Sequence, residues 1–479
     1  MANWNSTAFY IDGNWVAPQA TQLIDVINPA SELPVAKLAL GTVLDVDHAV
    51  AAAKRAFRSF SVTSRDERLT LLTKIAALMR ARFDDLAEAM TAEMGAPYTF
   101  SREGQVASGL EHIDQMIHVL KDFSFETQAG TTRIVKEAAG VCGLITPWNW
   151  PLNQIACKVA PALAAGCTMV LKPSEIAPLS AIVFTEILHE AGVPKGVFNL
   201  VHGDGPTVGH AMAVHPDIDV MSFTGSTRAG VQVARDSADT VKRVLQELGG
   251  NSANIVLDDA DLEHAIVNGV AGCYLNSGQS CDSPARLLVP HAAMDRAIEI
   301  ARRAAQAYSV GDPRDAAVQL GPVVSEMHFN KIQNFIEIGI REGAELVTGG
   351  VGRPAHLPKG YYVQPTVFAR VSPDMTIARN EIFGPVLSII GYSSEDEAVD
   401  IANDTEYGLA GYVQSGDIQR ARSMARRLRA GTVQINYPPA DYLAPFGGYK
   451  RSGNGREYGA YGLHDYLEFK SIIGFGLEE

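Results

Sequence analysis

Residues 140–175 read GVCGLITPWNWPLNQIACKVAPALAAGCTMVLKPSE, and they decide the fold class. The apolar run 141–146 predicts a buried strand, residues 153–165 predict a helix, and residues 168–171 predict a second strand. Strands that alternate with helices in this way are typical of a parallel sheet. Ligands bind at the carboxyl ends of such strands, and here those ends carry the segments PWNWP and KPSE.

The alternation of strand, turn and helix continues to about Gly250. After a predicted strand at 197–201, residues 202–209 read HGDGPTVG, in which the last glycine comes one position too late for a GxGxxG dinucleotide fingerprint. A further strand enters a helix through Gly225 and Ser226. The backbone N–H groups at such a helix start suit a phosphate, although Ser226 could equally serve only as a helix cap.

The remaining elements follow the same periodicity rules. Helices are predicted at 45–58 and 64–94, with Asp45 and Ser64 as N-caps and Gly95 as the stop. We expect the helices before residue 121 to serve the fold rather than the chemistry. Further helices are predicted at 105–120, 293–307, 326–342, 394–402 and 418–429, and strands at 363–368, 386–391, 409–413, 432–436 and 466–473.

The composition is that of an ordinary globular protein, with 479 residues, 47% of them hydrophobic, and room for two or three domains. A net charge of −14 excludes a nucleic-acid or anionic-membrane partner, because either needs a concentrated basic surface. The apolar stretch 155–171 is interrupted by Lys158, Pro161 and Gly166, so no membrane span is predicted. Five cysteines without a CxxC pair, and no secretory signal, predict a cytoplasmic protein with reduced thiols and no metal site.

Two segments carry candidate chemistry. Residues 271–290, AGCYLNSGQSCDSPARLLVP, place Cys281 on a connection between a predicted helix and a predicted strand, and LQELGG at 245–250 puts Glu247 in apolar surroundings. A thiol and a carboxylate of this kind suggest a nucleophile and its general base. Each residue alone also has a plain interpretation, since a lone cysteine is most often a small buried side chain and a lone glutamate is most often solvated.

Seven segments occur together in a fixed order over nearly the whole chain. They are PWNWP (147–151), KPSE (172–175), FTGSTRAG (223–230), ELGG (247–250), GQSC (278–281), EIFGP (381–385) and PFGGYKRSGNGRE (445–457). With them the chain resembles the NAD(P)-dependent aldehyde dehydrogenase superfamily. The resemblance implies an α/β fold with a Rossmann-like parallel-sheet cofactor domain, an α/β catalytic domain and a small β oligomerisation arm. The expected boundaries are 1–120 and 139–247 for the cofactor domain, 248–440 for the catalytic domain, and 121–138 with 460–479 for the arm.

The resemblance also implies roles for the reacting residues. Cys281 attacks the aldehyde carbon as a thiolate, Glu247 acts as general base, and Asn149 forms an oxyanion hole with the backbone N–H of Cys281. Hydride transfer to the nicotinamide leaves a thioester, and Glu247 then activates the water that releases the acid. Lys158 and Glu457 match a proton relay of the family, but they could equally form a structural ion pair.

The cofactor implied by the resemblance is NAD. Glu175 would repel the 2′-phosphate of NADP, so NAD is favoured while NADP stays open. The implied cofactor contacts are Thr146, Trp148, Lys172, Ser174, Glu175, Gly205, Gly225, Ser226, Leu248, Gly249, Glu381 and Phe383.

The substrate pocket is predicted from Trp150, Asn153, Cys157, Ser280, Asp282 and Phe446. Asp282 puts an anion beside the nucleophile, and no arginine occurs in residues 436–446 to pair with a substrate carboxylate. The sequence therefore predicts a neutral, largely apolar aldehyde that is medium-chain, terpenoid or aromatic.

Three other functions stay open at this point. They are a semialdehyde or ω-oxo acid dehydrogenase, a CoA-acylating dehydrogenase, and a non-catalytic binding or structural protein on the same scaffold. The presence of Glu247 argues for hydrolysis rather than transfer to CoA. An unpaired strand edge at 131–136 is expected to be covered by a partner subunit, which predicts a homodimer or homotetramer.

Overall fold

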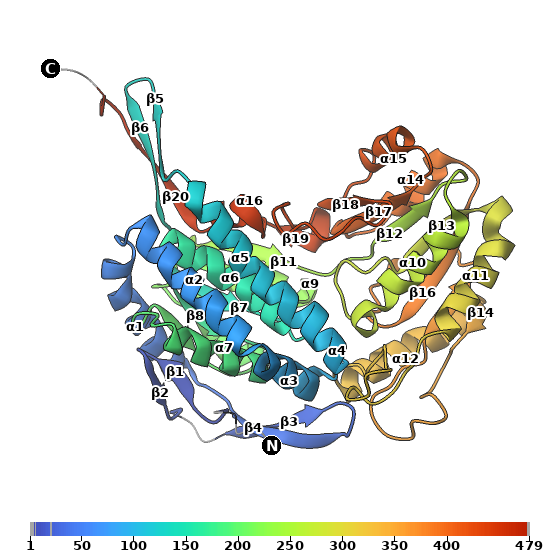
Figure 1. Ribbon diagram of the computed structural model, residues 1–479, viewed down its shortest axis with the longest axis horizontal. Coiled ribbons are helices and arrows are strands. Elements are labelled where there is room, and N and C mark those ends of the chain that lie inside the picture. The colour runs from blue at the N-terminus through green and yellow to red at the C-terminus, as the bar shows by residue number, and fades with distance from the viewer. Residues whose placement is uncertain (1–3, 5, 20–21, 477–479) are drawn as a thin grey trace.

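Two sheets carry the fold, and each is covered by its own helices, so that Figure 1 shows two lobes with a thin arm projecting from one of them. The computed structural model describes residues 4, 6–19 and 22–476. Residues 477–479 of the predicted arm, and residues 1–3, 5 and 20–21 of the predicted cofactor domain, lie outside the described part.

The first sheet has eight strands in the order β19-β11-β10-β7-β8-β9-β1-β2. The five strands from β11 to β9 are parallel, which confirms the parallel sheet predicted from residues 140–175. Every residue of β7, β8 and β10 is buried, as expected for strands covered on both faces. The strands are β1 (Phe9–Ile11), β2 (Asn14–Val16), β7 (Val141–Ile145), β8 (Thr168–Lys172), β9 (Phe198–Leu200), β10 (Val220–Thr224), β11 (Arg243–Glu247) and β19 (Gly453–Asn454).

The helices of this lobe begin and end close to the predicted positions, with two corrections. Asp45 is not the N-cap of the first helix: Thr42 takes that position, and Asp45 stands three residues later, where its Oδ2 accepts a hydrogen bond from the Thr42 N–H at 2.8 Å. Thr42 and Asp45 form a capping box, and in the sequence either residue can be taken for the N-cap. The predicted helix 64–94 is two helices that break at Arg82, whereas Ser64 and Gly95 are confirmed as cap and stop.

The helices of the first lobe are α1 (Val43–Phe60), α2 (Arg65–Ala81), α3 (Phe83–Met94), α4 (Tyr98–Phe100), α5 (Ala107–Asp122), α6 (Pro151–Ala165), α7 (Leu179–Glu190), α8 (His210–Val214) and α9 (Thr227–Ser237). A π-helical turn, Ser101–Val106, leads directly into α5.

The second sheet has seven strands in the order β14-β15-β16-β13-β12-β17-β18, all parallel except β14. The strand predicted at 363–368 begins only at Thr366, since Pro365 has no N–H to give to a ladder. The strands are β12 (Ala253–Val256), β13 (Arg286–Pro290), β14 (Glu345–Thr348), β15 (Thr366–Ala369), β16 (Val386–Tyr392), β17 (Ala410–Gln414) and β18 (Thr432–Ile435).

The helices around this sheet are α10 (Leu262–Tyr274), α11 (Met294–Gln306), α12 (Glu326–Arg341), α13 (Thr376–Arg379), α14 (Glu395–Asn403) and α15 (Ile418–Ala425). The helix predicted at 418–429 is α15, which ends at Ala425, four residues before the predicted end. Ser394 caps α14 as predicted, since its Oγ accepts from the Glu397 N–H at 3.2 Å.

The arm is a three-stranded antiparallel sheet of β5 (Glu126–Ala129), β6 (Thr132–Ala138) and β20 (Leu467–Ile472). The β5–β6 hairpin projects well beyond the body of the lobe (Figure 1), and the extended segment predicted at 131–136 is a strand from Thr132 onward, in β6. The prediction that its edge is unpaired is wrong, because β6 is the central strand of this sheet and pairs with β5 on one side and β20 on the other. Phe469 and Ile473 of the arm are 60% and 84% exposed. Just before β20, the short helix α16 (Gly459–His464) packs against α5 and α6.

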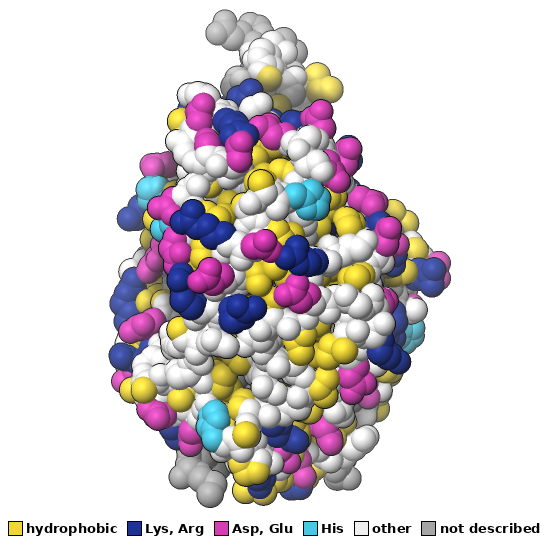
Figure 2. Space-filling view, turned by 90° about the vertical axis from the view of Figure 1, so that its right-hand side faces the viewer, with side chains coloured by type: hydrophobic (Ala, Val, Ile, Leu, Met, Phe, Trp, Pro, Cys, Tyr) yellow, Lys and Arg dark blue, Asp and Glu magenta, His cyan; other side chains and the backbone are white. Residues whose placement is uncertain are grey.

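The surface carries both signs of charge. Figure 2 shows acidic and basic side chains interspersed over the outer face of the second lobe. Arg370 on this lobe pairs with both Asp295 and Glu345. Within residues 4, 6–19 and 22–476, no helix combines the length and the apolar character that crossing a bilayer requires.

Candidate active site

The connection that carries Cys281 has an unusual backbone. Asn276, Ser277 and Gly278 follow α10 with φ values of 56°, 55° and 76°, all in the left-handed region. Such a run is costly for residues with side chains, so the surrounding structure must hold it. The Ser277 hydroxyl donates to the Gly321 carbonyl at 3.0 Å, and a Cβ at Gly278 would clash with the backbone of Gly384. The loop before Cys281 is therefore fixed by contacts from two other segments.

The PWNWP segment braces the same loop from the first lobe. The Asn149 Nδ2 donates to the Gln279 carbonyl at 3.0 Å, and the Trp150 Nε1 donates to the Ser280 Oγ at 2.9 Å. In return, the Asn276 Nδ2 donates to the Asn149 carbonyl at 2.8 Å. The structure thus brings together two segments that are 130 residues apart, as their common place in the predicted site requires.

Cys281 is partly exposed, whereas Cys142, Cys157, Cys167 and Cys273 are buried. Burial raises the pKa of the Cys281 thiol well above its usual range, and the carboxylates of Asp282, Glu381 and Glu247 raise it further. Burial also raises the pKa of Asp282 itself. The thiol is accordingly protonated near neutral pH, and a nearby base is needed to make it a nucleophile.

Glu247 is the last residue of β11 and is buried, with 5% of its surface exposed. Its Oε2 has no hydrogen-bond partner among the described residues. Burial raises the pKa of this carboxyl well above its usual range, and the charge of Glu457 adds to the effect. A buried carboxyl of raised pKa with a free oxygen has the properties of a general base.

Gly249 and Gly250 join Glu247 to the rest of the site. A Cβ at Gly250 would clash with the Cys281 carbonyl oxygen, and one at Gly249 would clash with the Glu381 carboxylate. The Glu381 Oε1 accepts from the Gly250 N–H at 2.9 Å, and burial raises the pKa of Glu381 to about 7. The ELGG segment therefore passes between the nucleophile on one side and EIFGP on the other.

Phe383 and Trp148 lie together beside Glu381. Phe383 has φ 65°, and its ring meets that of Trp148 edge to face with centroids 5.5 Å apart. The His328 Nε2 and the Phe383 carbonyl oxygen are 2.7 Å apart. Three of the predicted cofactor residues thus form one wall.

Lys158 and Glu457 form a buried ion pair. Lys158 has no exposed side-chain surface, its Nζ contacts the Glu457 Oε1, and the same ammonium donates to the Thr224 Oγ1 at 2.7 Å. Cys157 lies beside the pair, with its Sγ 3.3 Å from the Glu457 Oε2.

The other predicted cofactor residues lie at the carboxyl ends of β7, β8, β10 and β11 and at the turn after β9. The Lys172 Nζ donates to the Glu175 Oε2 at 3.3 Å, and Ser174 accepts from the Ile176 N–H. The Ser226 Oγ accepts from the Ala229 N–H at 3.3 Å, so this residue does cap α9. The remaining positions are Thr146, whose buried Oγ1 lacks a partner among the described residues, Gly205, beside which a Cβ would meet open space, Gly225, which lies against the Phe223 ring, and Leu248, which lies against Gly230.

A cavity of about 510 Å³ lies next to Trp150, and most of its lining residues were not predicted from the sequence. Trp150 is the one predicted pocket residue in its lining, while Phe446 stacks on Tyr458 and Asn153 contacts His112. The lining is Phe100, Glu103, Gly104, Ala107, Ser108, Glu111, Trp150, Leu275, Ala440 and Tyr442. The helices before residue 121 were expected to serve the fold, and the structure adds that α5 and the turn before it line this cavity.

One sequence signal could have revealed this wall. Phe100, Glu103, Ala107 and Glu111 recur every three or four positions and so share one helix face. The middle of that face is small, with Gly104, Ala107 and Ser108 leaving room in front of it. Amphipathic periodicity alone does not separate a face that packs from a face that lines a cavity.

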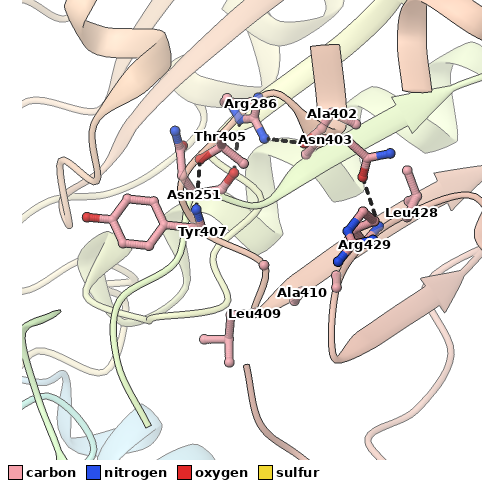
Figure 3. Close-up of a pocket in the computed structure, with 14 residues that line it drawn as sticks. Asn251, Arg286, Ala402, Asn403, Thr405, Tyr407, Leu409, Ala410, Leu428 and Arg429 are labelled. Carbon is pink, nitrogen blue, oxygen red and sulfur yellow. Dashed lines mark hydrogen bonds between the residues drawn. The ribbon is translucent and has the colours of Figure 1, made fainter. Parts of the chain in front are cut away.

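A second cavity is much smaller and is lined by Asn251, the residue directly after the ELGG segment, together with Arg286 and Arg429 (Figure 3). Its volume of about 20 Å³ is enough for about one water and too small for an aldehyde. Arg286 in its lining donates to the carbonyl oxygens of Asn251, Ile401 and Ala402, each at 2.9 Å. Two of these carbonyls belong to the last turn of α14, so Arg286 caps that helix and fixes the backbone after Gly250. The described residues contain no cluster of three or more histidine, cysteine, aspartate or glutamate side chains placed to hold a metal ion.

The two parallel-sheet lobes define an α/β fold, and a thiol on a fixed loop, an amide donor and a buried carboxyl lie together in it. The model of the aldehyde dehydrogenase family matches residues 15–472, and the chain belongs to this family.

Related proteins cover the whole chain. It is 54% identical over 468 residues to a 3-succinoylsemialdehyde-pyridine dehydrogenase from Pseudomonas sp, with 98% of each chain covered. Its structure matches that of a cysteine-to-alanine mutant of aldehyde dehydrogenase C from Pseudomonas syringae, in complex with NAD+ and octanal, at a TM-score of 0.99 and 51% identity, covering 100% of this chain and 99% of the other. A betaine aldehyde dehydrogenase from Staphylococcus aureus in complex with NAD+ matches at a TM-score of 0.94 and 37% identity, covering 99% and 96%.

Proposed function

We propose that the protein oxidises an aldehyde to the carboxylic acid with NAD, through a covalent bond between the aldehyde carbon and the Cys281 sulfur. The observation that carries this proposal is the placement of Cys281 beside a buried Glu247 whose Oε2 has no partner among the described residues. A second group, the Asn149 Nδ2, donates a hydrogen bond to the Gln279 carbonyl of the loop that leads to Cys281.

The reaction follows from these groups. Glu247 takes the thiol proton, through water where needed, and the Cys281 sulfur attacks the carbonyl carbon. The Asn149 amide and the Cys281 N–H donate to the oxyanion that forms, which stabilises the thiohemiacetal. The chemistry that NAD would supply when bound is acceptance of the hydride from the thiohemiacetal carbon, and Cys281 would then carry the acyl group as a thioester. Glu247 releases the thiol proton to bulk water and then takes a proton from the attacking water, whose hydroxide adds to the acyl carbon. The carboxylic acid leaves, and Glu247 returns its proton to the departing sulfur, which regenerates the thiol.

The residues present fit a dinucleotide. The buried Thr146 Oγ1 lacks a partner among the described residues, Gly205 leaves open space, and the backbone before α9 offers N–H groups for a phosphate. Lys172 and Glu175 would hold the adenine ribose and Glu381 the nicotinamide ribose. The Glu175 carboxylate disfavours a 2′-phosphate, so we propose NAD over NADP.

The substrate that the cavity favours is a neutral, largely apolar aldehyde. Phe100, Trp150, Leu275 and Tyr442 supply an apolar and aromatic wall. Two carboxylates, Glu103 and Glu111, stand in the same lining, where they would repel an aldehyde with its own carboxylate. The relative from Pseudomonas syringae was crystallised with octanal, and the one from Pseudomonas sp is named for an aldehyde on a pyridine ring, which supports an apolar or aromatic substrate.

The direct test is NADH production from a panel of aldehydes. We expect a higher kcat/KM for octanal than for succinic semialdehyde, and loss of turnover in Cys281→Ser. A clear preference for the semialdehyde would reverse the substrate assignment, and an unchanged rate in Cys281→Ser would overturn the mechanism. Acyl-CoA formation on addition of CoA would indicate the acylating alternative, and no NADH from any aldehyde would indicate a non-catalytic protein.

We further propose a cytoplasmic homodimer or homotetramer assembled through the arm. The free thiols and the exposed Phe469 and Ile473 support this assignment. We also propose the domain boundaries expected from the sequence, and limited proteolysis at the connections between the domains would test them.

A further inference from the structure

Cys157 was expected in the substrate pocket, but its contacts are with the buried ion pair. It lies on α6 next to Lys158, and 3% of its surface is exposed. Its Sγ is 3.3 Å from the Glu457 Oε2 and 3.5 Å from the carbonyl oxygen of Gln154. The thiol has one proton to donate, and the shorter contact to a charged acceptor is the stronger hydrogen bond.

The Glu457 carboxylate is therefore held at both oxygens. Its Oε1 contacts the Lys158 Nζ and its Oε2 contacts the Cys157 thiol. The backbone is fixed as well, since Glu457 exchanges two hydrogen bonds with Phe446, at 2.7 and 2.9 Å. Tyr458 follows at φ 71° and ψ 150°, a region that residues with side chains rarely adopt, and its ring stacks on that of Phe446. These contacts fix the orientation of the Glu457 carboxylate, and we infer that this orientation is important for its neighbours.

The neighbour that depends on this direction is Glu247. After burial, the charge of Glu457 is the largest cause of the raised pKa of the Glu247 carboxyl. Two buried carboxyls whose charges interact, such as Glu247 and Glu457, can share one proton. A proton that is shared in this way is not available for exchange with water. The charged and titratable groups that face Glu247 are Cys157 and Lys158 from α6, Arg456, Glu457 and Asp465 from the C-terminal segment, and Cys281 from the nucleophile loop.

We propose that Cys157 is a positioning residue for the hydrolysis step: its thiol proton holds the Glu457 Oε2, keeps that carboxylate directed at Lys158, and so leaves Glu247 free to take the proton from water. The assignment rests on the proposed function of Glu247. Burial and the Glu457 charge raise the pKa of the Cys157 thiol well above its usual range, so the thiol stays a donor throughout the working pH range. Cys157 touches no reacting atom and acts through Glu457 alone.

The test compares Cys157→Ala, which removes the donor, with Cys157→Ser, which keeps one. p-Nitrophenyl acetate is the probe, because the burst of nitrophenolate reports acylation of Cys281 and the steady state reports hydrolysis of the acyl-enzyme. In Cys157→Ala we expect an unchanged burst and a steady-state rate lowered about tenfold, the size of one hydrogen bond to a charged group. The freed Glu457 oxygen then competes for the Glu247 proton, so the acid limb of the pH profile moves to higher pH. Cys157→Ser restores both values.

Three results would overturn the proposal. One is a Cys157→Ala enzyme with the wild-type steady-state rate and pH profile, as expected of a small buried side chain without a role. A second is a parallel fall of burst, steady state and Tm, which indicates only a packing defect. A third is a Cys157→Ser enzyme that behaves like Cys157→Ala. Failure of the proposed function is a separate result, since then the wild-type enzyme makes no NADH from octanal.

Discussion

The side-chain amide of Asn149 is hydrogen-bonded to the main chain of Gln279, two residues before the nucleophile, at 3.0 Å. Asn149 follows β7 in the first lobe, while Gln279 follows α10 in the second. The side chain that we propose as the oxyanion donor thus also braces the loop that carries the Cys281 sulfur.

Replacing Asn149 with alanine should lower kcat for octanal oxidation by about 10²–10³-fold, because one oxyanion donor is lost. The loss of the hydrogen bond to Gln279 should also lower Tm, but this effect on stability should be small beside the effect on turnover. NADH production and thermal unfolding measure the two effects. Asn268→Ala on the half-buried side of α10 is the control, and an Asn149→Ala enzyme with control-like turnover would contradict the assignment.

Cys281 should be the one cysteine that iodoacetamide modifies in the native protein, because the other four are buried. The pKa of its thiol is raised well above the usual range, so the thiolate fraction and the alkylation rate should increase as the pH rises. Mass spectrometry of the alkylated protein counts the modified thiols. Cys281→Ser should take up no label, and labelling of several cysteines at equal rates would show that the buried ones open to solvent.

Glu381 should make NAD binding pH-dependent. Its pKa is raised to about 7 by burial, so it is protonated below that pH and ionised above it. An ionised carboxylate accepts ribose hydroxyls better, and NAD affinity should rise as the pH passes through 7. The stability of the folded state has the opposite pH dependence. The raised pKa of Glu381 stabilises the folded state most below the unfolded value of 4.5, and this stabilisation is lost as the pH rises through 7.

Calorimetric titration with NAD on either side of pH 7 measures the binding effect. Glu381→Gln should bind NAD weakly at both pH values and should gain stability relative to the wild-type protein above pH 7. A wild-type affinity that is flat across this range would exclude the role of Glu381 in binding.

The arm should be needed for assembly. Phe469 on β20 is 60% exposed, and the hairpin beside it projects from the body of the lobe. Phe469→Glu should reduce the molar mass measured by light scattering to that of a monomer, because a charge cannot be buried in the interface without a partner. Val62→Glu, at another exposed apolar position, is the control and should leave the mass unchanged.

The sequence predicted the parallel sheet and the places of PWNWP and KPSE because these depend on local periodicity. The apolar runs of β7 and β8 are buried along their whole length, and a buried parallel strand is apolar throughout. Ser226 shows the limit of the same approach. As a helix cap and as a phosphate-binding residue it has the same local sequence, so only the structure shows that its hydroxyl caps α9.

The contacts that periodicity cannot supply are those between distant segments. Cys157 and Glu457 are 300 residues apart, and no pattern in either segment points to the other. The same is true of Phe100 and Tyr442, which both line the large cavity. Cys281 and Glu247 were predicted as nucleophile and base from their local sequence and from the family resemblance, and the structure adds the close approach of Gly250 to the Cys281 carbonyl.

The site combines groups from the two lobes. Along the chain, Asn149 and Glu247 come before the turn at 257–261, which follows the first strand of the second sheet, and Cys281 and Glu381 come after it. A polypeptide cut at that turn would give two fragments, one without a sulfur nucleophile and one without a base. Each fragment should be inert, and mixing them should restore turnover to the extent that they re-associate. Activity in such a complementation experiment then becomes a measure of how tightly the two halves of the molecule hold each other.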